Sequence, residues 1–213
     1  TATLNNRITN IEKLTHYIAY SKSEGIPVLP PDINLSDVYF NTDGKSIRFG
    51  LSALKNVGIV VMEELIEERK ANGPFKDLCD FCSRASTQAL NKRCIESLIK
   101  AGAFDCFNMN RSVMMAIFPI IVDRVVERKK KAMDGQINIF GDMIEDEKLI
   151  EDSEIPKLNE YVNTVKLLYE KEISGTYLSG HPLDSFLNEI KHFTFNSSFL
   201  PKEENFNSVL EIW

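Results

Sequence analysis

Residues 52–65 read SALKNVGIVVMEEL, and this stretch decides the fold. Its start suits about one turn of helix, and KNVG at residues 55–58 interrupts the helical pattern. A longer helix then begins at Ile59 and ends at the strong stop Gly73-Pro74. Val57 is expected to pack inward, while Gly58 leaves the backbone free at the start of the second helix. The stretch therefore predicts two helices joined by a four-residue hairpin.

Such a hairpin can bind phosphate. Amide N–H groups at a helix N-terminus have no partner within the helix and can hold a phosphate oxygen, and Lys55 would add positive charge. A site of this kind contacts the nucleic-acid backbone rather than the bases, so it would bind DNA without reading sequence. The alternative is an ordinary corner between helices, in which Gly58 serves only as a cap.

A second stretch, SLIKAGAFDCFNMNR at residues 97–111, repeats this logic. Its hairpin lies around Ala101-Gly102-Ala103, and the following helix is expected to begin near Asn110. Two hairpins in tandem could grip the phosphates of both strands of a duplex; alternatively, the second copy is retained only for packing. The basic residues around the second hairpin are Lys92, Arg93, Lys100 and Arg111.

The remaining pattern indicates a mostly α fold with a small β-hairpin and flanking helices. The β-hairpin is predicted at residues 38–50, with Asp43-Gly44 in its turn. Pro119 is expected to interrupt or kink a long helix, and the charge-rich stretch 142–156 reads as a flexible loop. The predicted helices cover residues 8–25, 59–73, 74–85, 86–102, 111–133 and 158–178, with a short one from Pro182.

Composition is that of a globular protein, with 43% hydrophobic and 26% charged residues in 213 and a net charge of -6. The acidity is concentrated after residue 141, so it does not exclude nucleic-acid binding by the first part. There is no transmembrane stretch and no secretory signal, and the four cysteines read as reduced thiols of a cytoplasmic protein. We expect the chain to be a piece of a longer one.

No catalytic or metal site is predicted. Cys79 and Cys82 have zinc-like spacing but no second pair, because Cys94 and Cys106 do not form one; a buried helix face explains them better. His181 has no nucleophile or orienting acid at a recognisable spacing and reads as a turn residue.

The stretch GQINIFG at residues 135–141 places large apolar residues in a predicted loop. Gln136 offers a donor and an acceptor, while Ile139 and Phe140 could fill a pocket on another protein. This suggests a docking peptide. The alternative is that the apolar residues attach the loop to the helical core.

Several segments together resemble one family: GIPVLPPDIN, IRFGLSALKNVG, GPFKDLCDFCSR, LNKRCIESLIKAGAFD, GQINIFG and YLSGHPLD, in this order. The chain resembles the C-terminal half of bacterial DNA polymerase III alpha subunits over about residues 7–190. The resemblance implies the end of a fingers domain at 1–46 and a tandem helix-hairpin-helix region at 47–131. It implies a flexible loop with a clamp-binding peptide at 132–156, and a helical linker toward an absent OB-fold domain at 157–213.

The resemblance also implies roles. Lys55, Asn56, Val57 and Gly58, with Lys100, Ala101, Gly102 and Ala103, match the DNA-binding hairpins, and Gln136 to Phe140 matches the family's sliding-clamp peptide. Two positions depart from the pattern: Asn56 stands where the hairpin prefers Gly, and Ile139 stands where the clamp peptide more often has Leu.

The catalytic carboxylates of the family belong to a palm domain that this chain lacks, so we expect no polymerisation and no cofactor here, although the parent polymerase would use Mg²⁺. The expected partners are double-stranded DNA, the sliding clamp and, through the parent chain, other replicase subunits, with no membrane. The alternatives are a purely structural connector and a module of a DNA repair enzyme, against which GQINIFG and SGHPLD argue. Residues 191–213 are expected to be poorly ordered without the OB-fold domain.

Overall fold

The structure is a computed structural model that describes residues 1–8, 10–133 and 148–190. The chain divides into two compact units, Thr1–Ser179 and Gly180–Trp213. Helices of the first unit are α1 (Ala2–Asn5), α2 (Ile11–Ser23), α3 (Ile59–Asn72), α4 (Leu78–Arg84), α5 (Lys92–Lys100), α6 (Arg111–Met133) and α7 (Asn163–Ser174). Its 3-10 turns are η1 (Leu51–Ala53), η2 (Asp105–Phe107) and η3 (Asp152–Glu154), and its strands are β1 (Val28–Leu29), β2 (Asn41–Thr42) and β3 (Ile47–Arg48).

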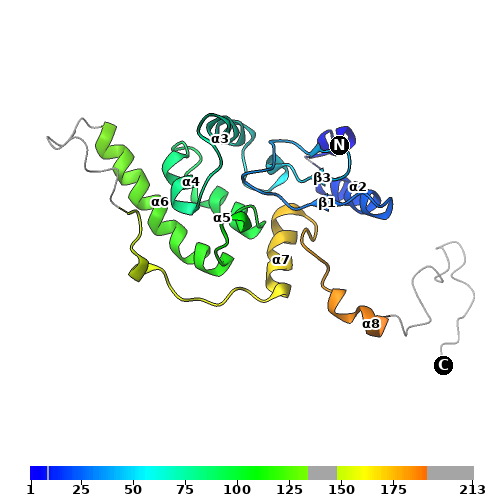
Figure 1. Ribbon diagram of the computed structural model, residues 1–213. Helices are drawn as coiled ribbons and strands as arrows, with labels where there is room; N and C mark the ends of the chain where they lie inside the picture. The colour runs from blue at the N-terminus through cyan, green and yellow to red at the C-terminus, as the bar shows by residue number, and fades with distance from the viewer. Residues whose placement is uncertain (9, 134–147, 191–213) are drawn as a thin grey trace, which may run out of the picture. The chain divides into compact units, whose positions relative to one another are not determined.

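The predicted mostly α fold with a small β-hairpin is confirmed (Figure 1). Strands β2 and β3 pair antiparallel around Asp43 and Gly44. The Asp43 carboxylate accepts hydrogen bonds from the backbone N–H of Lys45 at 2.9 Å and of Ser46 at 2.7 Å, which fixes the turn. The hairpin is one edge of a three-stranded sheet in the order β1-β3-β2, because β1 pairs with β3 in parallel. No local pattern indicated this third strand.

Helix α5 packs against α6 and α7 in the helical part of the first unit, and α4 packs against α6 (Figure 1). Leu98 and Ile99 of α5 are fully buried. Four aromatic rings continue this core, with centroids of successive rings 4.8 to 5.3 Å apart: Phe75, Phe81, Phe104 and Phe107. Edge-on and stacked ring contacts of this kind stabilise a core beyond the area that they bury.

Several helix predictions need correction. Helix α4 begins at Leu78 rather than Pro74, and α7 begins at Asn163 rather than Leu158. Helix α5 begins at Lys92 rather than near Ser86, because the Asn91 side chain accepts from the N–H of Arg93 and caps it there. Helix α6 runs through Pro119 without ending, so of the expected interruption or kink the interruption does not occur. Neighbouring elements pack against α6 and stabilise it, so one missing N–H group does not terminate it.

The described end of the acidic segment packs on the core, whereas the sequence suggested a free loop. Leu149 and Ile150 are buried, at 8% and 6% exposure. Arg124 of α6 donates to the Leu149 carbonyl at 2.8 Å and pairs with Glu154 at 2.6 Å. Hydrogen bonding to Arg124 lowers the pKa of the Glu154 carboxyl to about 2. The apolar pair in KLIED, together with Arg124, therefore anchors this stretch.

The second unit contributes η4 (Asp184–Phe186) and α8 (Leu187–Ile190). The predicted short helix after Pro182 is thereby confirmed, and the Asp184 carboxylate accepts from the N–H of His181 at 2.6 Å. Across the described part of the chain, no helix combines the length and apolarity needed to cross a membrane.

Candidate nucleic-acid interface

Hairpin 1, defined as residues 54–58, connects η1 to α3 and is held at three successive positions. The N–H of Lys55 donates to the carbonyl of Ile173 in α7 at 3.0 Å. The Asn56 side chain donates through Nδ2 to Oγ of Ser97 in α5 at 3.1 Å. Val57 is buried at 8% exposure, as predicted. Lys55 and Asn56 themselves are exposed, so the hairpin is anchored on its inner side and open on its outer side.

The conformation of Asn56 explains how asparagine can stand where the hairpin pattern prefers glycine. Its φ is +62°, in the left-handed region that the turn requires. Asn tolerates this conformation better than other residues with a side chain. The backbone of the hairpin therefore forms without glycine at this position, and the Asn side chain adds a contact that glycine could not make.

The start of α3 has no side-chain cap from any described residue. Gly58 is the N-cap residue, with φ -80° and no side chain that could cap the helix. Ile59 and Val60, the first two residues of the helix, are 43% and 61% exposed. The first N–H groups of a helix point out of its end, so those of α3 are open to an external acceptor. The partial positive charge of the helix end favours an anion there.

Hairpin 2, residues 101–103, is closed by a side chain. Gly102 has φ +81°, and the Arg111 guanidinium lies directly over it. A Cβ atom on Gly102 would lie 2.8 Å from Arg111 Cζ and would clash with the guanidinium. All three hairpin residues are buried, and the carbonyl of Ala103 accepts from the N–H of Ile33 at 2.8 Å. The turn η2 follows this hairpin, and α6 starts at Arg111.

Arg111 joins two carboxylates in this closed hairpin. It pairs with Asp105 at 2.6 Å and with the fully buried Glu170 of α7 at 3.1 Å, and its Nη1 donates to the Lys100 carbonyl at 3.2 Å. Burial lowers the pKa of the Arg111 guanidinium, but the hydrogen bonds and charges of Asp105 and Glu170 outweigh this and raise it. With a side chain only 4% exposed, Arg111 is part of the interior of the protein.

The first N–H groups of α6 already have an acceptor within the protein, the side chain of Glu160. Oε2 of Glu160 accepts from the N–H of Arg111 at 3.0 Å, and Oε1 accepts from the N–H of Ser112 at 3.3 Å. Burial raises the pKa of the Glu160 carboxyl, but the N–H donors of Arg111, Tyr161 and Ser112 bring it below its usual value. The carboxylate thus takes two of the donors that a phosphate oxygen would need.

The basic residues predicted around the hairpins fall into two groups. Lys92 pairs with Asp123 at 2.7 Å, and Lys100 pairs with Glu96 at 3.0 Å and Glu172 at 3.2 Å. Arg111 belongs with these, since its partners are Asp105 and Glu170. By contrast, Lys55 and Arg93 are exposed and form no ion pair with any residue that the structure describes.

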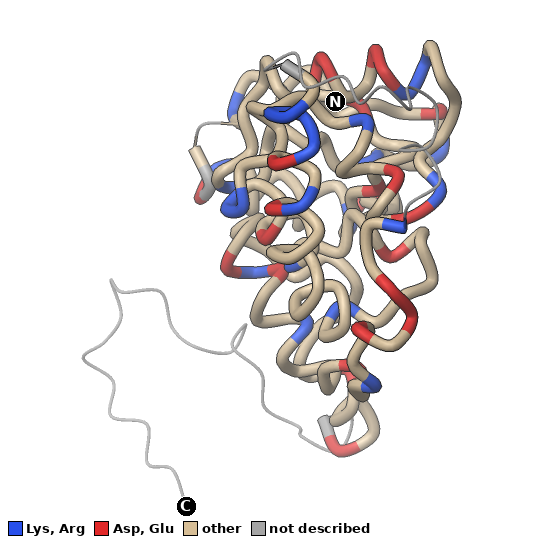
Figure 2. The backbone as a smooth tube through the Cα atoms, turned by 90° about the vertical axis from the view of Figure 1, so that its left-hand side faces the viewer, with Lys and Arg blue, Asp and Glu red and all other residues tan. Residues whose placement is uncertain are grey.

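Arg93 lies on α5, the helix that contacts hairpin 1 through Ser97. Arg93 precedes Ser97 by one turn of α5, and residues four apart in a helix share a face. Ser97 contacts Asn56, so Arg93 stands one helical turn before the residue that meets hairpin 1. Elsewhere in the first unit, acidic and basic residues are interspersed along the backbone (Figure 2).

Three residues of this region, Ser97, Glu160 and Glu170, were missed by sequence reasoning. A weak signal existed for two of them. Ser97 interrupts the apolar face of α5, and Glu170 lies on the same helical face as Leu167 and Ile173, which are buried. Glu160 precedes α7 in a stretch without periodicity, so nothing local marked it.

The cysteine pair of α4 consists of protonated thiols. Burial raises the pKa of the Cys82 thiol to about 12 and of the Cys79 thiol to about 11, which keeps both protonated. In the described ranges, no three His, Cys, Asp or Glu side chains are grouped so that they could hold a metal ion.

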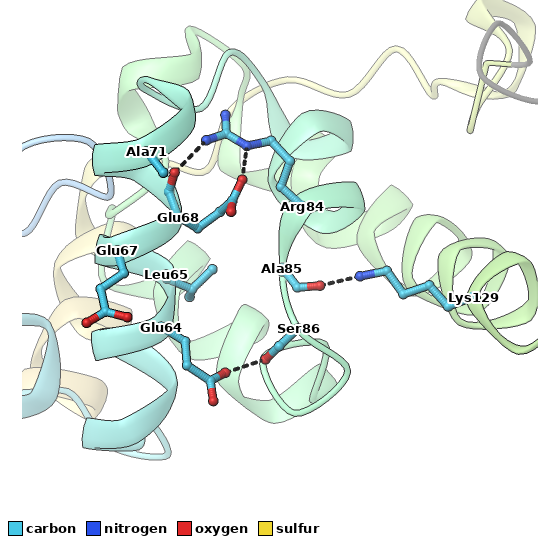
Figure 3. A pocket seen from close by; sticks show the side chains of 9 residues that line it. All are labelled: Glu64, Leu65, Glu67, Glu68, Ala71, Arg84, Ala85, Ser86 and Lys129. Carbon is cyan, nitrogen blue, oxygen red and sulfur yellow. Dashed lines mark hydrogen bonds and ion pairs between the residues drawn. The ribbon is translucent and has the colours of Figure 1, made fainter. Parts of the chain in front are cut away.

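A polar groove of about 490 Å³ lies away from both hairpins, between α3, α6 and residues 84–86 (Figure 3). Its charged walls are paired with one another. Arg84 binds Glu68 at 3.0 Å, Ser86 donates to Glu64 at 2.7 Å, and Lys129 donates to the Ala85 carbonyl. These contacts engage four of the five charged residues that line the groove: Glu64, Glu68, Arg84 and Lys129.

Comparison with known proteins supports the helix-hairpin-helix assignment. A family model described as helix-hairpin-helix motif matches residues 25–114, which include both hairpins. The chain is 36% identical over 193 residues to DNA polymerase III subunit alpha of Borreliella burgdorferi, covering 91% of this chain and 17% of that protein. It is 40% identical over 172 residues to the corresponding subunit of Thermus aquaticus, covering 81% and 13%. For Vibrio cholerae the identity is 37% over 186 residues, covering 87% and 16%.

The chain belongs to the DNA polymerase III alpha-subunit family. It spans less than a fifth of the length of these alpha subunits and therefore corresponds to one segment of them. The clamp-peptide prediction for this alpha-subunit segment, on Gln136, Ile139 and Phe140, lies outside the residues that the structure describes, as does the prediction for 191–213.

Proposed function

We propose that this alpha-subunit segment is non-catalytic and holds duplex DNA by its phosphate backbone through hairpin 1. The observation that carries the proposal is the uncapped, exposed start of α3 beside Lys55. Helix-end N–H groups offer directional donors to a phosphate oxygen, and a lysine without an ion pair among the described residues adds charge. Arg93, on the adjoining turn of α5, extends this positive surface toward a neighbouring phosphate.

Contacts of this kind bind DNA of any sequence, which a replicative polymerase needs. They involve phosphates and no base edges, so they position the duplex without selecting a sequence. Binding releases counterions from the duplex, so the affinity should fall steeply as salt rises. We expect modest affinity for the isolated chain, because its net charge is -6.

The test compares two variants with the same change in net charge. Lys55→Gln with Arg93→Gln removes the two cations that pair with no described carboxylate; Lys92→Gln with Lys100→Gln removes two paired ones. Binding to a short duplex of random sequence is measured by fluorescence anisotropy over a salt series. The first variant should bind at least about tenfold more weakly, with the slope of log K against log salt reduced by about 2. The second should stay within about threefold.

Equal losses in both variants would mean that general charge, rather than hairpin 1, attracts the DNA. No salt-dependent binding by the unaltered chain would favour the alternative that this segment is a structural connector. A module of a repair enzyme is disfavoured by the alpha-subunit relatives.

We also propose that residues 136–140 dock to a sliding clamp, in line with the resemblance of QINIF to the clamp peptide of the family. Linking DNA and clamp contacts in one chain would turn each rebinding to DNA into an intramolecular event. Calorimetric titration with a bacterial sliding clamp should give roughly micromolar affinity, about -8 kcal/mol, that is lost in Gln136→Ala and in Phe140→Ala. Unchanged binding in both variants would place the clamp contact elsewhere.

The parent subunit would act as a DNA-directed DNA polymerase in the cytoplasm, together with other replicase subunits. This segment carries no carboxylate group suited to the two-metal chemistry of nucleotidyl transfer among its described residues. A primer-extension assay of the segment alone should therefore show no product.

A further inference from the structure

The hydroxyl of Ser97 is buried among apolar side chains. Ser97 is 2% exposed, and the neighbouring α5 residues Ile95, Leu98 and Ile99 are apolar and fully buried. A buried hydroxyl is unfavourable unless it is hydrogen-bonded. Ser21, Ser83 and Ser174, in other helices, donate to the carbonyl four residues earlier.

Ser97 instead contacts hairpin 1. Its Oγ accepts from Nδ2 of Asn56 at 3.1 Å, across 41 residues of sequence. Asn56 is the residue with φ +62°, a conformation that is unfavourable for any residue with a side chain. The hydrogen bond is made from this conformation, so it stabilises the turn at its least favourable position.

We propose that Ser97 is a positioning residue for DNA binding, which holds hairpin 1 in its phosphate-binding shape through Asn56. This inference rests on the proposed function of hairpin 1. With Lys55 fixed to the Ile173 carbonyl and Val57 buried, the Asn56 contact completes a run of three anchored residues. The turn then presents the start of α3 without further ordering when a phosphate binds, and such preorganisation increases affinity.

Ser97 must be distinguished from a residue that only supports the core, and a glycine in place of Asn56 allows this. Glycine adopts positive φ without strain, so a hairpin with glycine at this position does not need the anchor. Asn56→Gly should therefore rescue the DNA binding that Ser97→Ala loses. A packing defect in α5 would not be rescued by a change in the exposed hairpin.

The experiment uses the whole chain and four variants: Ser97→Ala, Asn56→Gly, the double variant, and Ser36→Ala. Ser36 is the matched control, because it is fully buried and its Oγ accepts from the N–H of Asp32 at 3.0 Å, in a loop of the N-terminal part. Binding to duplex DNA is measured by anisotropy, and amide hydrogen exchange of residues 56–61 by NMR in the absence of DNA.

Ser97→Ala should weaken DNA binding about three- to tenfold and speed exchange in residues 56–61, whereas Ser36→Ala should do neither. The double variant should bind DNA within about twofold of Asn56→Gly. Unchanged exchange in Ser97→Ala, or a double variant as weak as Ser97→Ala, would overturn the proposal.

Two further outcomes stay informative. If Ser97→Ala does not fold, a variant of the exposed Asn56 can be tested instead. Asn56→Ala should bind DNA more weakly than Asn56→Gly. Equal DNA affinity of these two variants would contradict the proposal that the Asn56–Ser97 contact holds the turn. If the unaltered chain binds no DNA, the proposed function fails by itself, and the exchange comparison then decides whether Ser97 holds the turn.

Discussion

Hairpin 1 and hairpin 2 differ in what satisfies the N–H groups at the start of the next long helix. After hairpin 1, α3 begins at Ile59, and its N-cap residue is the exposed Gly58, which provides no side-chain cap. After hairpin 2 and η2, α6 begins under the Glu160 carboxylate, which accepts from its first two N–H groups. The first helix end can accept an external anion, and the second already holds an internal one.

The basic residues of the two hairpins also differ in whether they are paired. Lys55 in hairpin 1 pairs with no carboxylate among the described residues, whereas Arg111 at hairpin 2 is paired with Asp105 and Glu170. The two copies of the motif therefore differ structurally: one leaves a helix start open, and the other connects helices through buried ion pairs. Helix α7 serves both copies, through the Ile173 carbonyl at hairpin 1 and Glu170 at hairpin 2.

The largest effect should come from the buried carboxylate of hairpin 2. Glu170 accepts from Arg111, from the N–H of Leu178 at 3.1 Å, and from the N–H of Ser179 at 2.9 Å. Glu170→Ala leaves the N–H groups of Leu178 and Ser179 without this acceptor, and it removes one of the two carboxylates that pair with the buried Arg111. We expect a loss of about 3–5 kcal/mol in the free energy of unfolding, measured by urea denaturation.

Glu172→Ala is the control on the same helix. Glu172 pairs with Lys100, but its side chain is 54% exposed, so its removal should cost less than about 1 kcal/mol. If the two variants were equally stable, hairpin 2 would not depend on its internal ion pairs and the contrast with hairpin 1 would be lost.

The two glycines should respond differently to a methyl group. In Gly102→Ala the new Cβ meets Arg111 Cζ at 2.8 Å and Asp105 Oδ2 at 3.0 Å, with a φ of +81° that alanine adopts poorly. Arg111 cannot move aside without breaking its ion pairs. We expect a loss of about 2–3 kcal/mol in stability.

Gly58→Ala is the matched change in hairpin 1. Its φ is -80°, and the nearest atom to a new Cβ is Val61 Cγ2 at 3.8 Å. Alanine fits there, and the weaker N-cap should cost only about 0.5–1 kcal/mol. Thermal unfolding of both variants tests the difference, and a Gly58→Ala variant as unstable as Gly102→Ala would show that hairpin 1 is also tightly packed.

Local signals made much of this fold predictable. Gly73-Pro74 stops α3, Asp43-Gly44 marks the β-hairpin, and Gly102 marks the turn of hairpin 2, because each of these residues restricts the backbone where it stands. The open hairpin was recognisable for the same reason, since Val57, Gly58 and the following helix are contiguous in sequence.

The closure of hairpin 2 could not be predicted in this way. Arg111 reads as one more cation near a DNA-binding hairpin, and its burial depends on Glu170, 59 residues further along the chain. Strand β1 is a similar case, since its parallel partner is set by tertiary packing rather than by a turn. The role of a charged residue follows from its partner, which local patterns do not reveal.

The smallest predicted effect is a loss of stability at low pH. It should affect the start of α6 and leave the start of α3 unchanged. The pKa of Glu160 is lowered below its usual value of 4.5 in the folded protein. A carboxyl with a depressed pKa contributes stability that is complete above its unfolded pKa and is lost as pH falls through its folded pKa. Glu160→Ala should therefore cost about 1 kcal/mol near neutral pH, and the difference from the unaltered chain should shrink below pH ~4.5.

Hydrogen exchange locates this loss, once rates are corrected for the intrinsic effect of pH. Acidification should reduce the protection of the Arg111 and Ser112 N–H groups, which lose the charge of their acceptor. The N–H groups of Ile59 and Val60 should not respond, because no described carboxylate caps α3. Equal responses at both helix starts would mean that Glu160 does not seal α6, and hairpin 2 would then have to be considered as a second phosphate site.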